Sequence, residues 1–206
     1  LKYQSTKMGI KSLFALDNLW DGLGALIHSI KGAKYFIGKV TIYKEYPILC
    51  RDLIYEYLTK HFSDKDNLIK PITAVSVEAK SKKIAKKILV EDKPRPDYKL
   101  LNKAIREKGE NIPAMFNAYI GLSDTMRFFG SIKDDDFGSV YESGIMVVMD
   151  DLLETKKQRY IQPYIEYLRK MMDERRAART AAREAKEKQR ATEGKKPVWR
   201  RRAKKN

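Results

Sequence analysis

Few residues of this sequence stand at the spacings that catalytic or metal sites use. The histidines His28 and His61 are far apart, and neither has the nearby histidine or glutamate of a zinc motif. The single cysteine, Cys50, follows the apolar Leu49, which favours a buried small side chain over a nucleophile. No glycine-rich loop follows a strand-like segment, so phosphate-binding and dinucleotide-binding turns are missing. These patterns predict no enzyme activity and no cofactor.

Two acidic clusters are the remaining candidates for a metal site. They are Asp134–Asp136 and the pair Asp150 and Asp151. Carboxylates on facing helices could hold a divalent cation and make the chain a small metal-dependent enzyme. The alternating ligands and central glycine of an EF-hand are missing, which favours a solvated turn and an exposed helix edge. A third interpretation is that these acids meet a basic partner or the chain's own tail.

The strongest pattern is the basic C-terminal stretch, residues 173–206. It contains fourteen Lys or Arg and five Asp or Glu, so it carries +9 of the chain's net +16. Up to about Thr192 it is predicted to be a helix whose apolar positions are only alanines, and an irregular tail follows Gly194. Trp199 could stack on a base beside phosphates held by the neighbouring arginines. The predicted RNA-binding residues are Arg175, Arg176, Arg179 and Arg183 on the helix, and Lys195, Lys196, Trp199, Arg200, Arg201, Arg202, Lys204 and Lys205 in the tail.

The apolar periodicity upstream predicts an all-α fold, an irregular multi-helix domain with a long projecting basic C-terminal helix and an irregular tail. Ser12 is the predicted N-cap of the first helix, Pro47 opens the second, and Pro163 breaks the last two apart. The expected helices cover residues 13–30, 47–63, 76–90, 97–109, 113–130, 140–162 and 163–192.

Residues 32–44 are interpreted as irregular or helical. Their β-branched residues favour a strand, but no partner strand is evident. The expected domains are an N-terminal extension (1–11), a helical domain (12–172) and the basic extension (173–206). A possible sub-boundary lies at the linker 91–97, where two prolines should bar a helix.

Composition limits the class of protein. A pI of about 9.7 favours nucleic acid or an anionic membrane surface as partner. One cysteine excludes an internal disulfide framework and fits a reducing compartment. No apolar run is long enough to span a membrane. The chain begins at Leu1, which indicates either removal of an organelle presequence or residues missing upstream.

Together these patterns predict a non-catalytic structural subunit of a large organellar ribonucleoprotein, most simply a mitochondrial ribosomal protein. Its tail would contact rRNA or another structured RNA, its helical body would contact neighbouring subunits, and it would take no small-molecule substrate. The expected location is the mitochondrial matrix, or otherwise the cytoplasm. The alternative is an accessory subunit of a mitochondrial membrane complex, such as an ATP synthase or a respiratory complex, whose tail meets anionic lipids.

Overall fold

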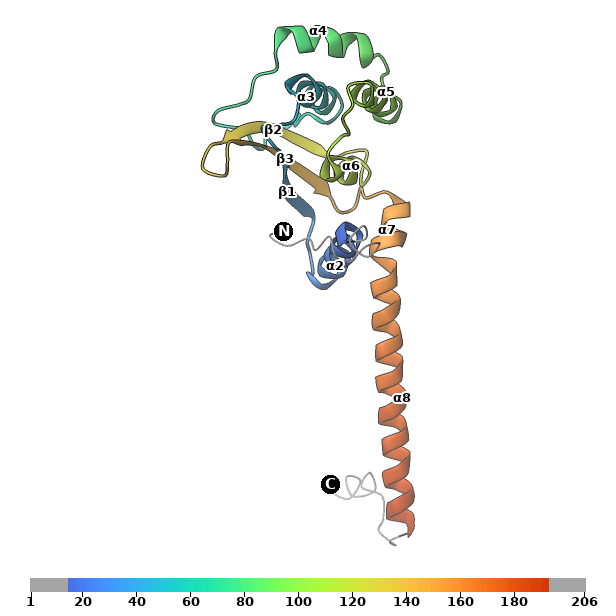
Figure 1. The fold of residues 1–206 in the computed structure, drawn as a ribbon. Helices are drawn as coiled ribbons and strands as arrows, with labels where there is room; N and C mark the ends of the chain where they lie inside the picture. Colours follow the sequence, from blue (N-terminus) through green and yellow to red (C-terminus); the bar gives the residue numbers. More distant parts are fainter. Residues whose placement is uncertain (1–14, 193–206) are drawn as a thin grey trace. The chain divides into compact units, whose positions relative to one another are not determined.

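A computed structural model describes residues 15–192, and it contains both helices and a β-sheet (Figure 1). The chain divides into two compact units. One is the continuous segment Ile30–Lys157, and the other combines Leu1–Ser29 with Gln158–Asn206. The described residues form seven helices and one three-stranded sheet, so the predicted all-α fold is wrong.

The sheet belongs to the continuous unit and is antiparallel throughout. Its strands are β1 (Tyr35–Ile42), β2 (Arg127–Asp134) and β3 (Val140–Val148), in the order β1-β3-β2. β2 and β3 form a hairpin whose loop contains two left-handed residues, Gly138 at φ 80° and Ser139 at φ 57°. The side chain of Asp134 accepts a hydrogen bond from the Phe137 N–H and so helps to form the turn.

The three strands replace segments for which the sequence predicted helical or irregular structure. The residues 32–44 contain β1, the end of the predicted helix 113–130 begins β2, and the predicted helix from residue 140 is β3. The partner of β1 is remote, since Thr41 pairs with Glu142, 101 residues further on. No short-range hairpin signal can therefore mark β1. β3 is the central strand and carries buried residues on both faces, so its apolar run lacks strand alternation and is easily mistaken for a helix.

Helix α3 (Ile48–Phe62) lies in the middle of this unit and confirms the predicted second helix. It packs against β2 and against the helices α4 (Ala79–Ile88) and α5 (Pro94–Arg106). Because α3 has neighbours on several sides, polar residues as well as apolar ones are buried on it. Cys50 on α3 is only 1% exposed, which confirms the predicted buried position.

Helix α5 begins inside the segment that was expected to be a linker. Pro94 and Pro96 lie in its first turn, where backbone N–H groups have no intrahelical acceptor and proline's missing donor costs little. The interpretation that these prolines bar a helix is therefore wrong. Asp97, the first residue of the predicted helix 97–109, is instead a buried residue of the first turn of α5.

The remaining helices follow the prolines closely. Helix α6 (Ala114–Ile120) starts after Pro113 as predicted but ends before β2. Helix α7 (Glu154–Tyr160) and helix α8 (Gln162–Thr192) are separated at Ile161. Pro163 lies in the first turn of α8, which confirms the predicted break at this proline.

In the second unit, α2 (Ala15–Ser29) packs against the end of α7 and against α8. The rings of Trp20 and Tyr160 have centroids 6.3 Å apart, and Arg159 Nη1 lies 2.9 Å from Asp21 Oδ1. A Cβ on Gly24 would collide with the Tyr160 carbonyl, so only glycine allows this close approach. α2 confirms the predicted first helix, whereas its predicted N-cap lies outside the described residues. In the part of the chain that the structure describes, no helix is long and apolar enough to span a membrane.

Candidate active site

A cavity of the continuous unit lies among α3, α5, α6 and the first turn of α7. Its volume is about 370 Å³, which is at the lower end of the range for small-molecule sites. Its lining combines aromatic and apolar side chains with several charged ones. The lining residues are Tyr57, Phe62, Pro94, Arg95, Tyr98, Lys99, Asn117, Ile120, Gly121, Asp124, Leu153, Thr155 and Lys156.

One wall of the cavity is aromatic and held in place by hydrogen bonds. The Tyr57 ring lies 5.9 Å from both the Tyr98 and the Phe62 ring centroids. The Tyr57 hydroxyl donates to the Pro94 carbonyl oxygen at 3.1 Å, and the Tyr98 hydroxyl donates to Asn117 Oδ1. Burial raises the pKa of both phenols, and nearby carboxylates raise that of Tyr57 further. Both tyrosines therefore stay neutral and give the wall an apolar surface with fixed polar ends.

Charged side chains border this aromatic wall. The lining contains three cations, Arg95, Lys99 and Lys156, and one acid, Asp124. Arg95 Nε lies 3.4 Å from Asp124 Oδ1, a long contact between two largely exposed groups. Such an exposed pair contributes little to stability and can be opened by a ligand. The cavity can thus receive an apolar group against its aromatic wall and a zwitterionic group beside its charged side chains.

A buried carboxylate supports the aromatic wall from behind. Asp97 Oδ2 accepts hydrogen bonds from Lys60 Nζ at 2.8 Å and from His61 Nε2 at 2.7 Å. Asp97 Oδ1 accepts a third from the Glu91 N–H at 2.9 Å. Burial alone would raise the pKa of Asp97, but these donors outweigh it and lower the pKa. The ionised carboxylate ties α3 to α5 and to the chain between α4 and α5.

His61 belongs to this network rather than to the cavity surface. Its side chain is 4% exposed, and its ring centroid lies 5.1 Å from that of Tyr57, which does line the cavity. The imidazole therefore positions Tyr57 and does not itself reach a ligand in this structure. Sequence reasoning missed the network, because Lys60 and His61 lie 37 and 36 residues from Asp97 and no local motif joins them.

Three further buried charged residues, Arg51, Asp52 and Glu142, lie in the same unit. Arg51 donates to Asp52 Oδ1 through Nε at 3.0 Å and Nη2 at 2.7 Å, and its guanidinium lies 4.4 Å from the Tyr141 ring centroid. Glu142 Oε1 accepts from Thr41 Oγ1 at 2.9 Å, while its other oxygen is buried without a hydrogen-bond partner among the described residues. The Arg51–Asp52 pair is a structural contact. Glu142 stands out as a carboxylate that is only half satisfied.

The structure describes only some of the residues that were predicted to bind RNA. Arg175, Arg176, Arg179 and Arg183 lie on the exposed part of α8, whereas the predicted tail residues, 195–205, lie outside the described residues. None of the four lines the cavity described above.

Carboxylates of the two acidic clusters contact a lysine and hydroxyl groups. Asp135 Oδ1 pairs with Lys133 Nζ at 2.6 Å and accepts from Ser139 Oγ, so this cluster belongs to the β2–β3 turn. Asp151 Oδ2 accepts from Thr125 Oγ1 at 2.6 Å. Asp150 and Asp151 lie in a turn after β3. The prediction that they lie on a helix is therefore wrong. Within residues 15–192, no three His, Cys, Asp or Glu side chains are grouped as metal ligands would be.

Comparison with known proteins gives two strong matches. The chain is 47% identical over 166 residues to a glycine N(alpha)-acyltransferase of Bacteroides thetaiotaomicron, covering 81% of this chain and 49% of that protein. It is 47% identical over 165 residues to a protein of the same name from Phocaeicola vulgatus, covering 80% of this chain and 50% of that protein. The chain thus spans about half the length of these curated relatives. No family model matches the chain. No solved structure matches it either.

These matches overturn the function that the sequence patterns predicted. Over about four-fifths of this chain, 47% of the aligned residues are identical to those of proteins that are named as enzymes acting on glycine. The predicted ribosomal subunit without catalytic activity is therefore wrong, and so are its rRNA partner and the membrane-complex alternative. The error arose because the basic helix dominates the charge pattern, while the candidate site is assembled from residues distant in sequence. The mitochondrial location stays a prediction, and both relatives are bacterial.

Proposed function

We propose that this chain forms part of an acyltransferase that attaches an acyl group to the α-amino nitrogen of glycine. The observation that carries the proposal is the 47% identity, over four-fifths of the chain, to two proteins of that name. The cavity bordered by Tyr57 and Tyr98 is the proposed substrate site. The chain spans about half of each relative. The proposal therefore concerns only what the residues of this chain contribute to the reaction.

The reaction requires one bond to form and one to break. The neutral amino nitrogen attacks the acyl carbonyl carbon, and an amide bond forms. The bond from the acyl carbon to its carrier atom then breaks, and the carrier leaves with the electron pair and the proton that the amine gives up. An enzyme accelerates this transfer by orienting the amine, accepting its proton and stabilising the negative charge on the carbonyl oxygen.

The cavity lining suits both substrates. Asp124 is the one carboxylate among the described lining residues, and it is proposed to hold the amino group, accept its proton and pass that proton to the leaving carrier. Lys99 is proposed to bind the carboxylate of glycine, because an ammonium group forms strong charge-assisted hydrogen bonds with a carboxylate. The aromatic wall and Ile120 offer an apolar surface for the acyl chain. Opening the exposed Arg95–Asp124 contact would free Asp124 for this role.

Steady-state kinetics of variants test the site. The natural full-length protein is assayed with glycine and acyl donors of increasing chain length. Lys99→Gln should raise KM for glycine about 10- to 100-fold, the effect of losing a hydrogen bond to a charged group. Asp124→Asn should lower kcat by a similar factor. Lys103→Gln, one turn further along α5 and outside the cavity, and Asp150→Asn are matched controls that should leave both constants unchanged.

Two outcomes would contradict the proposal at different levels. Equal effects of Lys99→Gln and Lys103→Gln would remove the cavity from the substrate site and leave acyl transfer itself standing. Absence of any transfer to glycine by the folded wild-type protein, with every donor tried, would contradict acyl transfer.

A further inference from the structure

The distal part of α8 is a helix without a core. Every residue from Met172 to Thr192 is exposed, and no residue of α8 is buried. Packing therefore does not explain why this segment is helical. Its stability comes from strong helix formers, chiefly alanine, arginine, lysine and glutamate, and from contacts such as Arg183 Nε to Glu187 Oε1 at 3.6 Å. A helix of this kind presents its side chains to a partner or to water.

The charges of α8 are sorted onto different faces. Arg169, Arg176, Arg183 and Arg190 recur every seven residues, and seven residues complete two helical turns with a drift of only about 20°. Arg175, Arg179 and Lys186 extend the same face by the same rule. We call these seven cations the basic face.

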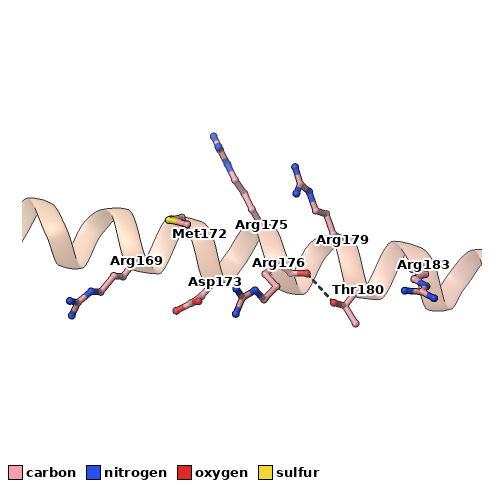
Figure 2. Close-up of a pocket in the computed structure, with 8 residues that line it drawn as sticks. All are labelled: Arg169, Met172, Asp173, Arg175, Arg176, Arg179, Thr180 and Arg183. Atoms are coloured by element: carbon pink, nitrogen blue, oxygen red, sulfur yellow. Dashed lines mark hydrogen bonds between the residues drawn. The ribbon is translucent and has the colours of Figure 1, made fainter. Parts of the chain in front are cut away.

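The arginines of the basic face gather along one stretch of α8. The described lining of a pocket on this helix includes five of them, together with Asp173 (Figure 2). Figure 2 shows Arg175 and Arg179 extending from one side of the ribbon and Arg169 and Arg176 from the other.

Acids lie mainly away from this face. By the same helical spacing, Glu174 lies on the side opposite to the basic face, Glu166 and Glu184 lie between the two sides, and alanines fill much of the remaining surface. Asp173 and Glu187 stand three or four residues from arginines of the basic face and lie along one edge of it. Glu187 at the border pairs with Arg183. From Arg169 to Arg190 the stripe runs for about 32 Å at 1.5 Å per residue. The basic face is therefore a long, narrow surface of seven cations with two acids, Asp173 and Glu187, along one edge.

We propose that the basic face of α8 docks on anionic lipid headgroups at a membrane surface. A second helix is a poor occupant, because the seam of a coiled coil needs apolar residues where α8 repeats arginine every seven positions. Headgroups move laterally, so they can adapt to a row of guanidinium groups without a preformed acidic partner. Met172, which is 67% exposed among the cations, adds an apolar side chain suited to the headgroup boundary.

The binding should be electrostatic and reversible. Each cation near an anionic membrane surface strengthens binding by roughly fivefold, and the effect falls off within a Debye length. Alanine offers little apolar area for insertion, so added salt should release the protein. This inference does not depend on acyl transfer and would survive the failure of that proposal.

Vesicle co-sedimentation with two matched double variants tests it. The full-length protein is mixed with vesicles of phosphatidylcholine alone or of phosphatidylcholine with phosphatidylserine. Wild type should bind the mixed vesicles and not the neutral ones. Arg176→Gln with Arg183→Gln should weaken binding about 25-fold, at fivefold per cation. Lys170→Gln with Lys188→Gln removes the same charge from the opposite side of the helix and should leave binding nearly unchanged.

Circular dichroism checks that both variants keep their helix, which glutamine favours. Equal weakening by the two double variants would overturn the proposal, because net charge alone would then account for binding. Equal binding to both kinds of vesicle would overturn it as well. Binding to a soluble acidic polypeptide but not to mixed vesicles would replace the lipid surface with an acidic protein partner.

Discussion

Asp97 is the residue on which the support of the cavity depends most. Its side chain is fully buried and joins the side chains of Lys60 and His61, neighbours on α3, to the backbone N–H of Glu91. A buried carboxylate of this kind is stabilising only while all its donors are present. Its neighbour Tyr98 forms the cavity wall, so the network links stability to the shape of the site.

Asp97→Asn should destabilise the fold by about 2 to 4 kcal/mol. The amide removes the negative charge that Lys60 and His61 face, and it presents a donor where the carboxylate accepted. Urea unfolding, with equal m-values for the two proteins, measures the difference. Asp92→Asn, at an exposed position in the loop that precedes α5, is the control and should change stability by less than about 0.5 kcal/mol.

The same carboxyl predicts a pH dependence. The folded-state pKa of Asp97 is lowered, since hydrogen bonds to the charged form outweigh burial. Its stabilisation is therefore complete above the ordinary aspartate pKa of about 3.9 and is lost as the pH falls through the folded value. The stability gap between wild type and Asp97→Asn should be constant near neutral pH and shrink below about pH 4. A gap that persists unchanged in acid would show that the charge of Asp97 is not the stabilising feature.

Among the elements, β1 is the one whose position depends most on close packing. Gly38 of β1 lies against the hydroxyl of Tyr119 on α6, where a Cβ would clash, and the Phe36 and Tyr119 rings stack with centroids 6.0 Å apart. α6 also provides Asn117 and Ile120 of the cavity lining. The contact at Gly38 therefore fixes a cavity-forming helix against the sheet.

Gly38→Ala should cost about 1 to 3 kcal/mol, the usual effect of overpacking a close contact. In a Tyr119→Phe background the same substitution should cost less, because the hydroxyl that the new Cβ meets is gone. Gly22→Ala is the control: nothing lies within 4 Å of its Cβ position, so alanine should stabilise α2 by roughly 0.5 to 1 kcal/mol. Additive effects of Gly38→Ala and Tyr119→Phe would argue against the contact.

Elements marked by local signals could be predicted from the sequence, and the others could not. Prolines and apolar spacing located α3 and the break before α8. β1 and β3 were missed because their pairing joins residues such as Thr41 and Glu142, whose long separation leaves no trace in a local pattern. The candidate site could not be predicted for the same reason, because its residues come from four elements that are brought together only in the folded chain.

At the scale of the whole molecule, burial is distributed unevenly. α3 carries nine buried residues and β3 carries six, whereas α8 from Met172 onward has none. Amide hydrogen exchange should therefore be slowest in α3 and β3, close to the rate set by global unfolding, and fastest in α8 beyond Met172. Anionic vesicles should slow exchange in this part of α8. Slow exchange there in the free protein would mean that another segment already covers the basic face.

Acyl transfer to glycine is tested most directly by mass spectrometry of the reaction product. The natural full-length protein is incubated with isotope-labelled glycine and a panel of activated acyl donors, and the extract is analysed for N-acylglycine. We expect a labelled amide that accumulates in proportion to enzyme and is strongly reduced by Asp124→Asn. If the folded protein forms no labelled amide with any donor, acyl transfer to glycine is contradicted. The same conclusion holds if another amine is acylated and glycine is not.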